Sequence, residues 1–411
     1  MASEVTPQPA VRSTTRATLP ITLLVQIAAS AAVLAPSVAA PRLLTHLGLT
    51  PVAVGVYIAL VYAAAALSSQ WAAALIKRWG PIRTSQVSVL LCGCGVLLVS
   101  LPHLGPAVLG ALLIGAGYGP ITPASSEILA RTTPPHRYAL VFSLKQTGVP
   151  GGGALAGLLV PTVLNLAGHV AALGQIALLC VAGAALGEAL RGDLDRLRNP
   201  RSPLPTLALM SQPIRFVLAD PMLRRLALCS LVFSTVQVCL TAYLVSFLHA
   251  DLMWTLVAAG AAVSTAQLAG VFGRVAWGVV ADVRRDARGT LLGLAGAMTL
   301  ASLAMSLLTP GTPTLWVITL LIAYGATGVG WNGVFLATVA RVVPMQQAAA
   351  ATAGSLFFTY VGVVVGPPLF GAIGERVGTL GIAYSLLALP LACTIWLLAR
   401  AHWETAPAQQ R

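Results

Sequence analysis

Two cationic side chains lie deep inside apolar stretches of the sequence. Lys145 comes eight residues after Arg137, which places it about 12 Å along a helix at 1.5 Å per residue, and Arg274 comes eight residues before Asp282, at a similar depth. A charge within a membrane span costs roughly 2.5–3.5 kcal/mol on insertion scales, so each of the two needs a partner or a function. The pair predicts a site that attracts an anion.

Each cation also has a structural interpretation. Arg274 would extend to the polar interface or donate to backbone carbonyls, and for Lys145 a structural role is as well supported as a functional one. Glu127 is the only acid of the first half that we expect to reach a central cavity. Because it precedes Arg131 by four residues, a favourable helical spacing, it is either a structural ion-pair partner or the acid that couples transport to protons.

Uncharged polar and aromatic residues within the apolar stretches complete the candidate site. Trp331 and Asn332, beside Gly330, combine an aromatic face with an amide in a glycine-rich stretch, and Gln146 directly follows Lys145. Further candidates are Gln26, Ser30, Tyr118, Thr122, Gln237 and Tyr243. Single polar residues in spans often only bridge helices, and that alternative stays open for all of them.

These residues must be positioned by membrane-spanning helices. The chain has 411 residues, 57% of them hydrophobic and 9% charged, and a soluble domain of this size could not cover its surface with so few charges. Apolar blocks of roughly 20 residues, the length that crosses a bilayer, recur along the whole chain. We predict twelve spans, at 20–40, 52–75, 84–101, 107–130, 139–163, 170–190, 226–248, 253–281, 290–308, 314–339, 348–372 and 378–399.

The longest polar stretch between spans, 191–225, divides the chain near its middle. We therefore predict an all-α integral membrane protein built from two six-helix bundles, at 20–190 and 226–399, which the linker 191–225 joins. The tails 1–19 and 400–411 would lie on the same side of the membrane as the linker, because the number of spans is even. We expect a monomer embedded in the lipid bilayer.

The net charge of +13 follows the predicted topology. Of the 24 Lys and Arg residues, only Arg42 and Arg376 fall in loops on the side opposite the tails, and Lys145 and Arg274 fall within spans. Cytoplasmic loops are the ones enriched in Lys and Arg. This distribution predicts cytoplasmic termini in a cell inner membrane. Because membrane topology accounts for the basic charge, we do not expect the protein to bind nucleic acid.

Residues for enzyme chemistry do not occur at useful spacing. The six cysteines lie in or beside apolar spans, and Cys92 and Cys94 lack the two-residue gap of a zinc or redox motif. We find no nucleotide-binding loop and no metal-spaced cluster, so we expect neither an enzyme nor a metal or cofactor. The stretch up to Ala40 is similar to a signal peptide, and we interpret it as the first helix because its removal would break the twelve-helix count.

The two bundles look like copies of one unit. Arg131 to Pro134 ends the fourth span and Arg341 to Pro344 ends the tenth, with an offset of 210 residues. The next span in each half carries a cluster of Gly and Pro, residues that let helices approach closely or bend. The predicted hinge positions are Gly148, Pro150, Gly362, Gly366 and Pro367.

The loop between the eighth and ninth spans carries a motif of Gly278, Asp282, Arg284 and Arg285. It resembles the signature of the major facilitator superfamily, and the pattern around Gly366 resembles a second motif of that family. The resemblance implies a conformational latch, in which Asp282 accepts from the N-terminus of a neighbouring helix and the two arginines clamp the contact.

The equivalent loop between the second and third spans is degenerate. Arg78, Gly80 and Arg83 remain as latch candidates, whereas Lys77 stands where the family has an Asp and Ala73 where it has a Gly. This half would therefore lack the acidic contact.

The family resemblance implies a secondary active transporter that works by alternating access, with its substrate site between the two halves. Arg274, four residues before Gly278, resembles the helix-8 arginine that meets the substrate carboxylate in monocarboxylate carriers. We therefore predict proton-coupled transport of a small organic anion such as a monocarboxylate. The alternative is a proton-antiport exporter of hydrophobic compounds, although its usual acid in the first span and arginine in the fourth are absent here.

Overall fold

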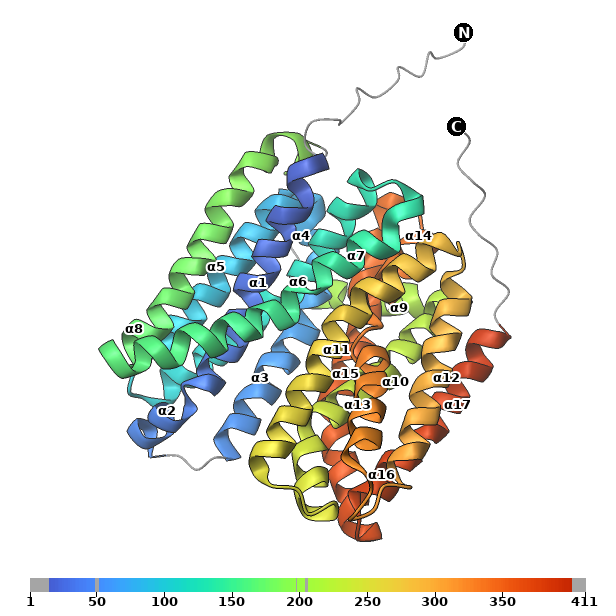
Figure 1. The fold of residues 1–411 in the computed structure, drawn as a ribbon. Helices are drawn as coiled ribbons and strands as arrows, with labels where there is room; N and C mark the ends of the chain where they lie inside the picture. Colours follow the sequence, from blue (N-terminus) through green and yellow to red (C-terminus); the bar gives the residue numbers. More distant parts are fainter. Residues whose placement is uncertain (1–14, 49–51, 197, 204–205, 401–411) are drawn as a thin grey trace.

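The computed structural model describes residues 15–48, 52–196, 198–203 and 206–400, and these are almost entirely helical (Figure 1). In the first half the helices are α1 (Thr15–Val38), α2 (Ala40–Leu47), α3 (Val52–Ser69), α4 (Ala72–Trp79), α5 (Pro81–Val99), α6 (Leu104–Thr132), α7 (Tyr138–Gln146) and α8 (Gly148–Leu194). In the linker and second half they are α9 (Ser211–Ala219), α10 (Pro221–Ser246), α11 (Leu256–Val283), α12 (Ala287–Met305), α13 (Thr314–Gly328), α14 (Asn332–Val342), α15 (Ala348–Val377), α16 (Leu380–Leu386) and α17 (Ala388–Ala399). Four short helical turns, η1 (Pro135–Arg137), η2 (Leu207–Met210), η3 (Phe247–Asp251) and η4 (Met345–Gln347), join some of them.

The predicted all-α membrane fold with twelve crossings is confirmed. Within the described ranges, nine helical segments are long and apolar enough to span a membrane, and α3 with α4 forms a tenth that bends by 56°. One of the nine, Pro135–Leu194, has 60 residues, and it turns back at Gly168, whose φ of 80° a side chain would disfavour. It therefore contains two crossings, and the 28-residue α11 supplies the remaining one.

Several spans are interrupted, and two of these breaks lie beside the buried polar residues Lys145 and Trp331. Between α7 and α8 the break falls at Thr147, and Pro150 in the next turn has no N–H to donate to the carbonyl of Gln146. Between α13 and α14 the break covers Val329 to Trp331, beside Gly328 and Gly330. Both breaks expose backbone carbonyls in the interior, where they need other donors.

Each half has its own apolar core, and each core also includes some residues from the other half. The first-half core includes Leu356 and Tyr360 of α15, and the second-half core includes Ala139 and Phe142 of α7. Figure 1 shows the blue-to-green half beside the yellow-to-red half, with α7 against α11 and α14. The halves therefore meet along α7 on one side and α15 on the other.

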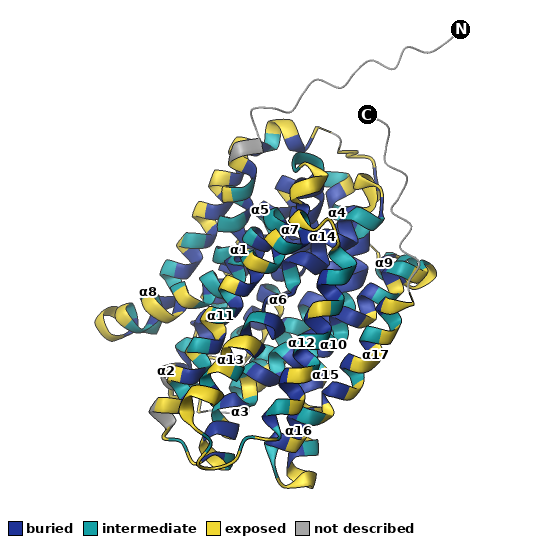
Figure 2. Ribbon diagram, turned by 45° about the vertical axis from the view of Figure 1, so that its right-hand side comes forward, coloured by how far each residue is buried: buried dark blue, intermediate teal, exposed yellow. Residues whose placement is uncertain are grey.

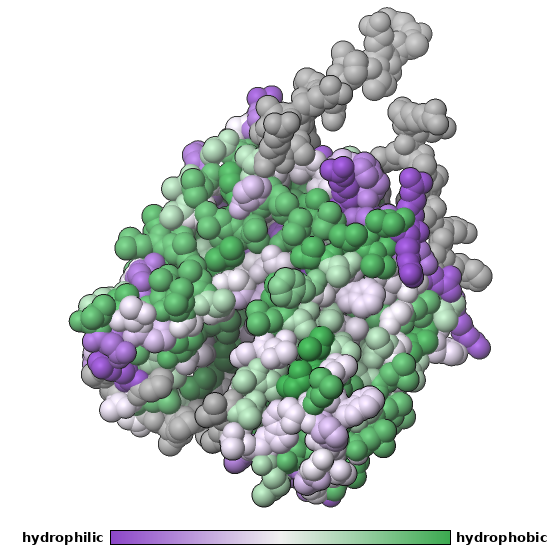
Figure 3. Space-filling model, viewed as in Figure 1, coloured by the Kyte–Doolittle hydropathy of each residue, from purple (hydrophilic) through white to green (hydrophobic). Residues whose placement is uncertain are grey.

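The outer surface of the spans is apolar. Large side chains such as Leu158, Leu300 and Trp316 are exposed, and the exposed residues in Figure 2 lie along the outer faces of the helices as well as at their ends. Figure 3 shows hydrophobic residues over most of one face, and a hollow between the two halves in its lower part. A lipid-facing surface requires this distribution.

We call the end of the molecule that carries Arg78, Arg131, Arg284 and Arg341 the basic end. It lies at the top of Figure 1, whereas α2 and α16 lie at the opposite end. Two helices were not predicted, namely α2 and α9. The predicted linker 191–225 thus begins inside α8 and contains α9 and the start of α10, while the tails 1–14 and 401–411 lie outside the described residues.

Candidate functional site

Lys145 is completely buried among neutral oxygen atoms. Its Nζ donates to Gln26 Oε1 at 2.6 Å, to Gln146 Oε1 at 3.2 Å and to Thr122 Oγ1 at 3.4 Å, and only 1% of the residue is exposed. The partners come from α1, α6 and α7, so the ammonium ties three helices of the first half together. All three of its N–H groups are used in this state.

The network around Lys145 continues to the predicted candidate Tyr118. Gln26 Nε2 donates to Ser30 Oγ at 3.1 Å and contacts the Tyr118 hydroxyl at 3.5 Å. The ring of Tyr118 packs edge-on against Tyr62 at 6.3 Å between centroids, and Tyr62 lies 6.0 Å from Tyr360 of α15. An aromatic contact thus connects this network to the second half.

Arg274 of α11 donates to the carbonyls that both helix breaks leave free. Its Nε donates to Val329 O at 3.0 Å, at the break between α13 and α14, and its Nη1 donates to Gln146 O across the two halves. Gln146 O is the acceptor that Pro150 cannot serve. The third nitrogen, Nη2, has no hydrogen-bond partner among the described residues, and the side chain is 2% exposed.

No carboxylate neutralises either buried cation within the described chain. The four ion pairs found there join Arg131 to Glu127, Arg191 to Glu188, Arg196 to Asp193, and Arg341 to Asp282. Glu127 is 5% exposed and is paired with Arg131 on its own helix α6. Gln146 instead links the cations, because its side chain accepts from Lys145 and its carbonyl accepts from Arg274.

Gln237, Trp331 and Asn332 form a second polar cluster. Gln237 Oε1 accepts from Trp331 Nε1 at 2.9 Å and from Asn332 Nδ2 at 3.0 Å. Trp331 is buried between Phe233 and Phe335, with ring centroids 5.5 and 5.4 Å away. The sequence predicted Trp331 and Asn332 as a pair and Gln237 as a separate candidate, and the structure brings Gln237 of α10 to that pair at the break between α13 and α14.

The two clusters occupy matching places in the repeat. Gln26 and Gln237 lie on α1 and α10, the first spans of their halves, and are 211 residues apart; Thr122 and Asn332 are 210 apart. In each half the glutamine Oε1 contacts the residue from the fourth span, at 3.4 Å from Thr122 and 3.0 Å from Asn332. Only the first half adds a cation, Lys145.

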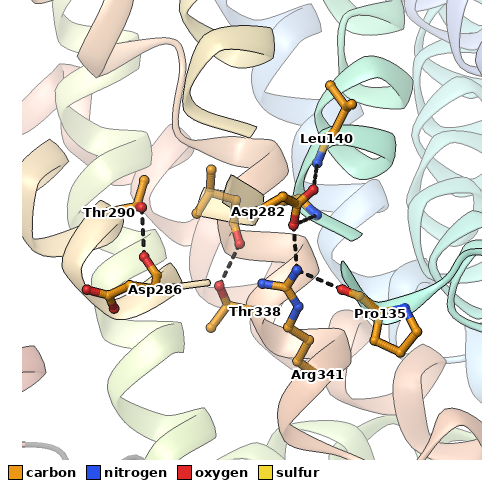
Figure 4. A network of polar contacts seen from close by, with 9 residues as sticks. Pro135, Leu140, Asp282, Asp286, Thr290, Thr338 and Arg341 are labelled. Carbon is orange, nitrogen blue, oxygen red and sulfur yellow. Dashed lines mark hydrogen bonds and ion pairs between the residues drawn. The ribbon is translucent and has the colours of Figure 1, made fainter. Parts of the chain in front are cut away.

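The latch predicted at Asp282 joins the two halves at the basic end. Its carboxylate accepts from the backbone N–H of Ala139 at 3.1 Å and of Leu140 at 2.7 Å, at the start of α7 (Figure 4). Arg341 donates to Asp282 at 2.6 Å and to Pro135 O at 2.9 Å. The carboxylate therefore caps a helix N-terminus, where the helix dipole favours an anion.

Arg341 replaces the two arginines expected to clamp this latch. Arg284 and Arg285 are exposed and donate to no described residue from their side chains. They follow the end of α11, whereas Arg341 extends from α14 and also lies over the Tyr138 ring at 5.8 Å. Gly278 has the predicted role of close contact, because a Cβ there would come within 2.8 Å of Ala139 O and 2.7 Å of Ser143 Oγ.

In the first half the equivalent loop is held by its own linker. Asp195, at the end of α8, accepts from Ile82 N at 2.9 Å and Arg83 N at 3.0 Å, and it fills the space beside Gly80. Burial raises the pKa of the Asp195 carboxyl, and the two backbone hydrogen bonds oppose that rise. Arg78 donates to Ser202 O. Apart from its place in a charged stretch, nothing in the sequence distinguishes Asp195 as a contact residue.

The predicted hinge residues lie at tight helix contacts. Gly148 of α8 packs on Gln26 of α1, where a Cβ would be 2.9 Å from the Gln26 Cβ. In α15, Gly362 and Gly366 pack against α10, and Pro367 O accepts from the Tyr243 hydroxyl at 2.8 Å. Of these positions, Gly148 directly follows the break at Thr147, and Pro150 lies in the same first turn of α8.

Comparisons with known proteins agree on one family. Residues 22–359 match the family model described as the Major Facilitator Superfamily. No curated protein sequence matches the chain.

Solved structures share the fold at low sequence identity. The outward conformation of the transporter FucP is similar with a TM-score of 0.72 and 15% sequence identity, and the match covers 92% of this chain and 98% of FucP. The proton:xylose symporter XylE is similar with a TM-score of 0.70 and 13% sequence identity, and the match covers 94% of this chain and 95% of XylE. An outward-facing bacterial homologue of the iron transporter ferroportin is similar with a TM-score of 0.71 and 13% sequence identity, and the match covers 93% of this chain and 98% of that chain. Such identities carry over the fold alone.

Proposed function

The chain belongs to the Major Facilitator Superfamily and is a membrane transporter, and we propose that its cargo is a small organic anion such as a monocarboxylate. One observation carries this proposal: Lys145 and Arg274 are both buried, come from different halves, and have no carboxylate partner in the described chain. Unpaired buried cations are costly. An anion bound between the halves would offset that cost.

Arg274 is the side chain best prepared for a carboxylate. Its guanidinium is fixed by Val329 O and Gln146 O, and Nη2 has no hydrogen-bond partner in the part of the chain that the structure describes. Arginine binds carboxylates in a planar geometry with more than one N–H. Lys145 lies one residue from Gln146, so a carboxylate at Nη2 would also experience the ammonium charge.

Transport would proceed by alternating access. The latch at Asp282 holds the basic end closed in this state, and the surface is hollowed between the halves nearer the opposite end (Figure 3). We propose that the basic end faces the cytoplasm of a cell inner membrane, with both termini on that side, because its loops carry most of the Lys and Arg residues. We further propose that the transporter acts as a monomer.

Uptake into proteoliposomes tests the cargo and the coupling together. We expect a labelled monocarboxylate such as lactate or propionate to accumulate, and to accumulate several-fold faster when the outside is made acidic. Empty liposomes and a neutral sugar such as xylose are the controls. Absence of carboxylate uptake, together with proton-driven extrusion of a hydrophobic dye, would instead support the exporter.

Glu127 is our candidate for proton coupling. Replacing it by glutamine keeps the shape but removes the proton that a carboxyl carries, so we expect Glu127→Gln to take up carboxylate without stimulation by the pH gradient. Glu188→Gln is the matched control, because Glu188 also pairs with an arginine on its own helix but is exposed. If stimulation persists in Glu127→Gln, Glu127 is only the ion-pair partner of Arg131.

A further inference from the structure

The orientation of the Gln237 amide is fixed by its neighbours. The indole Nε1 of Trp331 can only donate, so the atom of Gln237 that meets it at 2.9 Å must be the oxygen. The same oxygen lies 3.0 Å from the Asn332 amide, which must therefore present its nitrogen. Each of the two amides therefore has a single orientation that fits its partners.

This orientation leaves one acceptor and one donor unused. Asn332 Oδ1 and Gln237 Nε2 make no hydrogen bond to any described residue, and both side chains are only partly buried. Trp331 is 1% exposed and is packed between two phenylalanines, and its indole N–H holds Gln237 in this orientation. A hydroxyl group suits such a pair, because it donates one hydrogen bond and accepts others.

Asn332 and its neighbour Trp331 lie at the same helix break as the carbonyl that Arg274 contacts. Val329 O accepts from Arg274, and Trp331 and Asn332 follow it by two and three residues. In the first half the matching glutamine, Gln26, bonds through both ends of its amide, to Lys145 and to Ser30. The second-half cluster is thus the one with free hydrogen-bonding capacity.

We propose that Gln237 and Asn332 bind a hydroxyl group of the cargo, which makes the cargo a hydroxycarboxylate rather than a plain carboxylate. The inference rests on the proposed function, since the carboxylate would be held by Arg274. A site built to pair a hydroxyl discriminates strongly against the analogue that lacks it, because its polar groups are then left unpaired.

Matched pairs of acids that differ by one hydroxyl test the inference: lactate and propionate, 3-hydroxybutyrate and butyrate, mandelate and phenylacetate. In proteoliposomes we expect the hydroxy acid of at least one pair to be preferred about tenfold in kcat/KM. Asn332→Leu should bring that ratio close to one. Trp331→Phe, which removes the N–H that orients Gln237, should lower it as well.

Asn165→Leu is the control, since Asn165 is exposed on α8 and should leave the ratio unchanged. Equal uptake of both members in every pair would overturn this inference and leave the anion proposal standing. A preference that survives in Asn332→Leu would also overturn it. Uptake of no acid at all would overturn the proposed function, and the inference with it.

Discussion

Replacing Arg274 by alanine is expected to reduce carboxylate uptake about a hundredfold in a protein that still inserts. The guanidinium donates to Val329 O and Gln146 O, and hydrogen bonds from charged groups contribute about 1.5–3 kcal/mol each. A loss of about 2.8 kcal/mol in the transport cycle corresponds to a factor of about 100. Arg274→Lys keeps the charge but not the planar donor set, so we expect an intermediate rate.

Initial rates over a range of carboxylate concentrations separate the two roles that the contacts suggest. If Arg274 holds the cargo, KM rises in Arg274→Ala; if it mainly links the halves through Gln146 O, the maximal rate falls while KM stays. Arg288→Ala is the control, because Arg288 also donates to a backbone carbonyl, that of Ala399, but is at the surface. Wild-type uptake by Arg274→Ala would refute both roles.

The sequence predicted the fold well because the bilayer restricts it strongly. Long apolar blocks have to be helices. The repeat predicted two bundles of the same design, and the basic loops predicted which ends of the helices lie on the same side of the membrane. The short amphipathic helix α2 and the linker helix α9 were missed, since neither is long enough to appear as an apolar block.

The site was predicted as a set of residues and not as an arrangement. The candidate residues were named from their polarity within apolar spans and, for Arg274, also from the family resemblance; they were Lys145, Arg274, Gln237, Trp331 and Asn332. Gln146 links the two cations partly through its backbone carbonyl, which Pro150 leaves without a helical donor. Whether Arg274 reaches that carbonyl depends on how the helix runs through the break at Thr147, and the sequence does not show this. Arg341 and Asp195 were missed as contact residues because each meets its partner across a long sequence separation, 59 residues to Asp282 and 113 to Ile82.

Replacing Asp282 by asparagine is expected to open the basic end of the transporter. The carboxylate caps α7 through Ala139 N and Leu140 N and pairs with Arg341 from α14. Its side chain is 9% exposed, so the ion pair is poorly screened by solvent and the loss would be larger than for a surface pair. We expect a cost of about 2 kcal/mol to the closed state, or about thirtyfold in the conformational equilibrium.

Amide hydrogen exchange at the start of α7 measures this opening directly, because Asp282 accepts from two of its amides. Peptides covering residues 135–146 should exchange about thirtyfold faster in Asp282→Asn. Asp286→Asn is the matched control: Asp286 caps α12 through Gly289 N at 2.7 Å, within a single half, so its loss should speed exchange at α12 and leave α7 protected. If α7 stays protected in Asp282→Asn, the halves are held by other contacts, such as the hydrogen bond from Gln70 Nε2 to Ala353 O at 2.9 Å on the opposite side of the interface, and Asp282 is not needed to close the basic end.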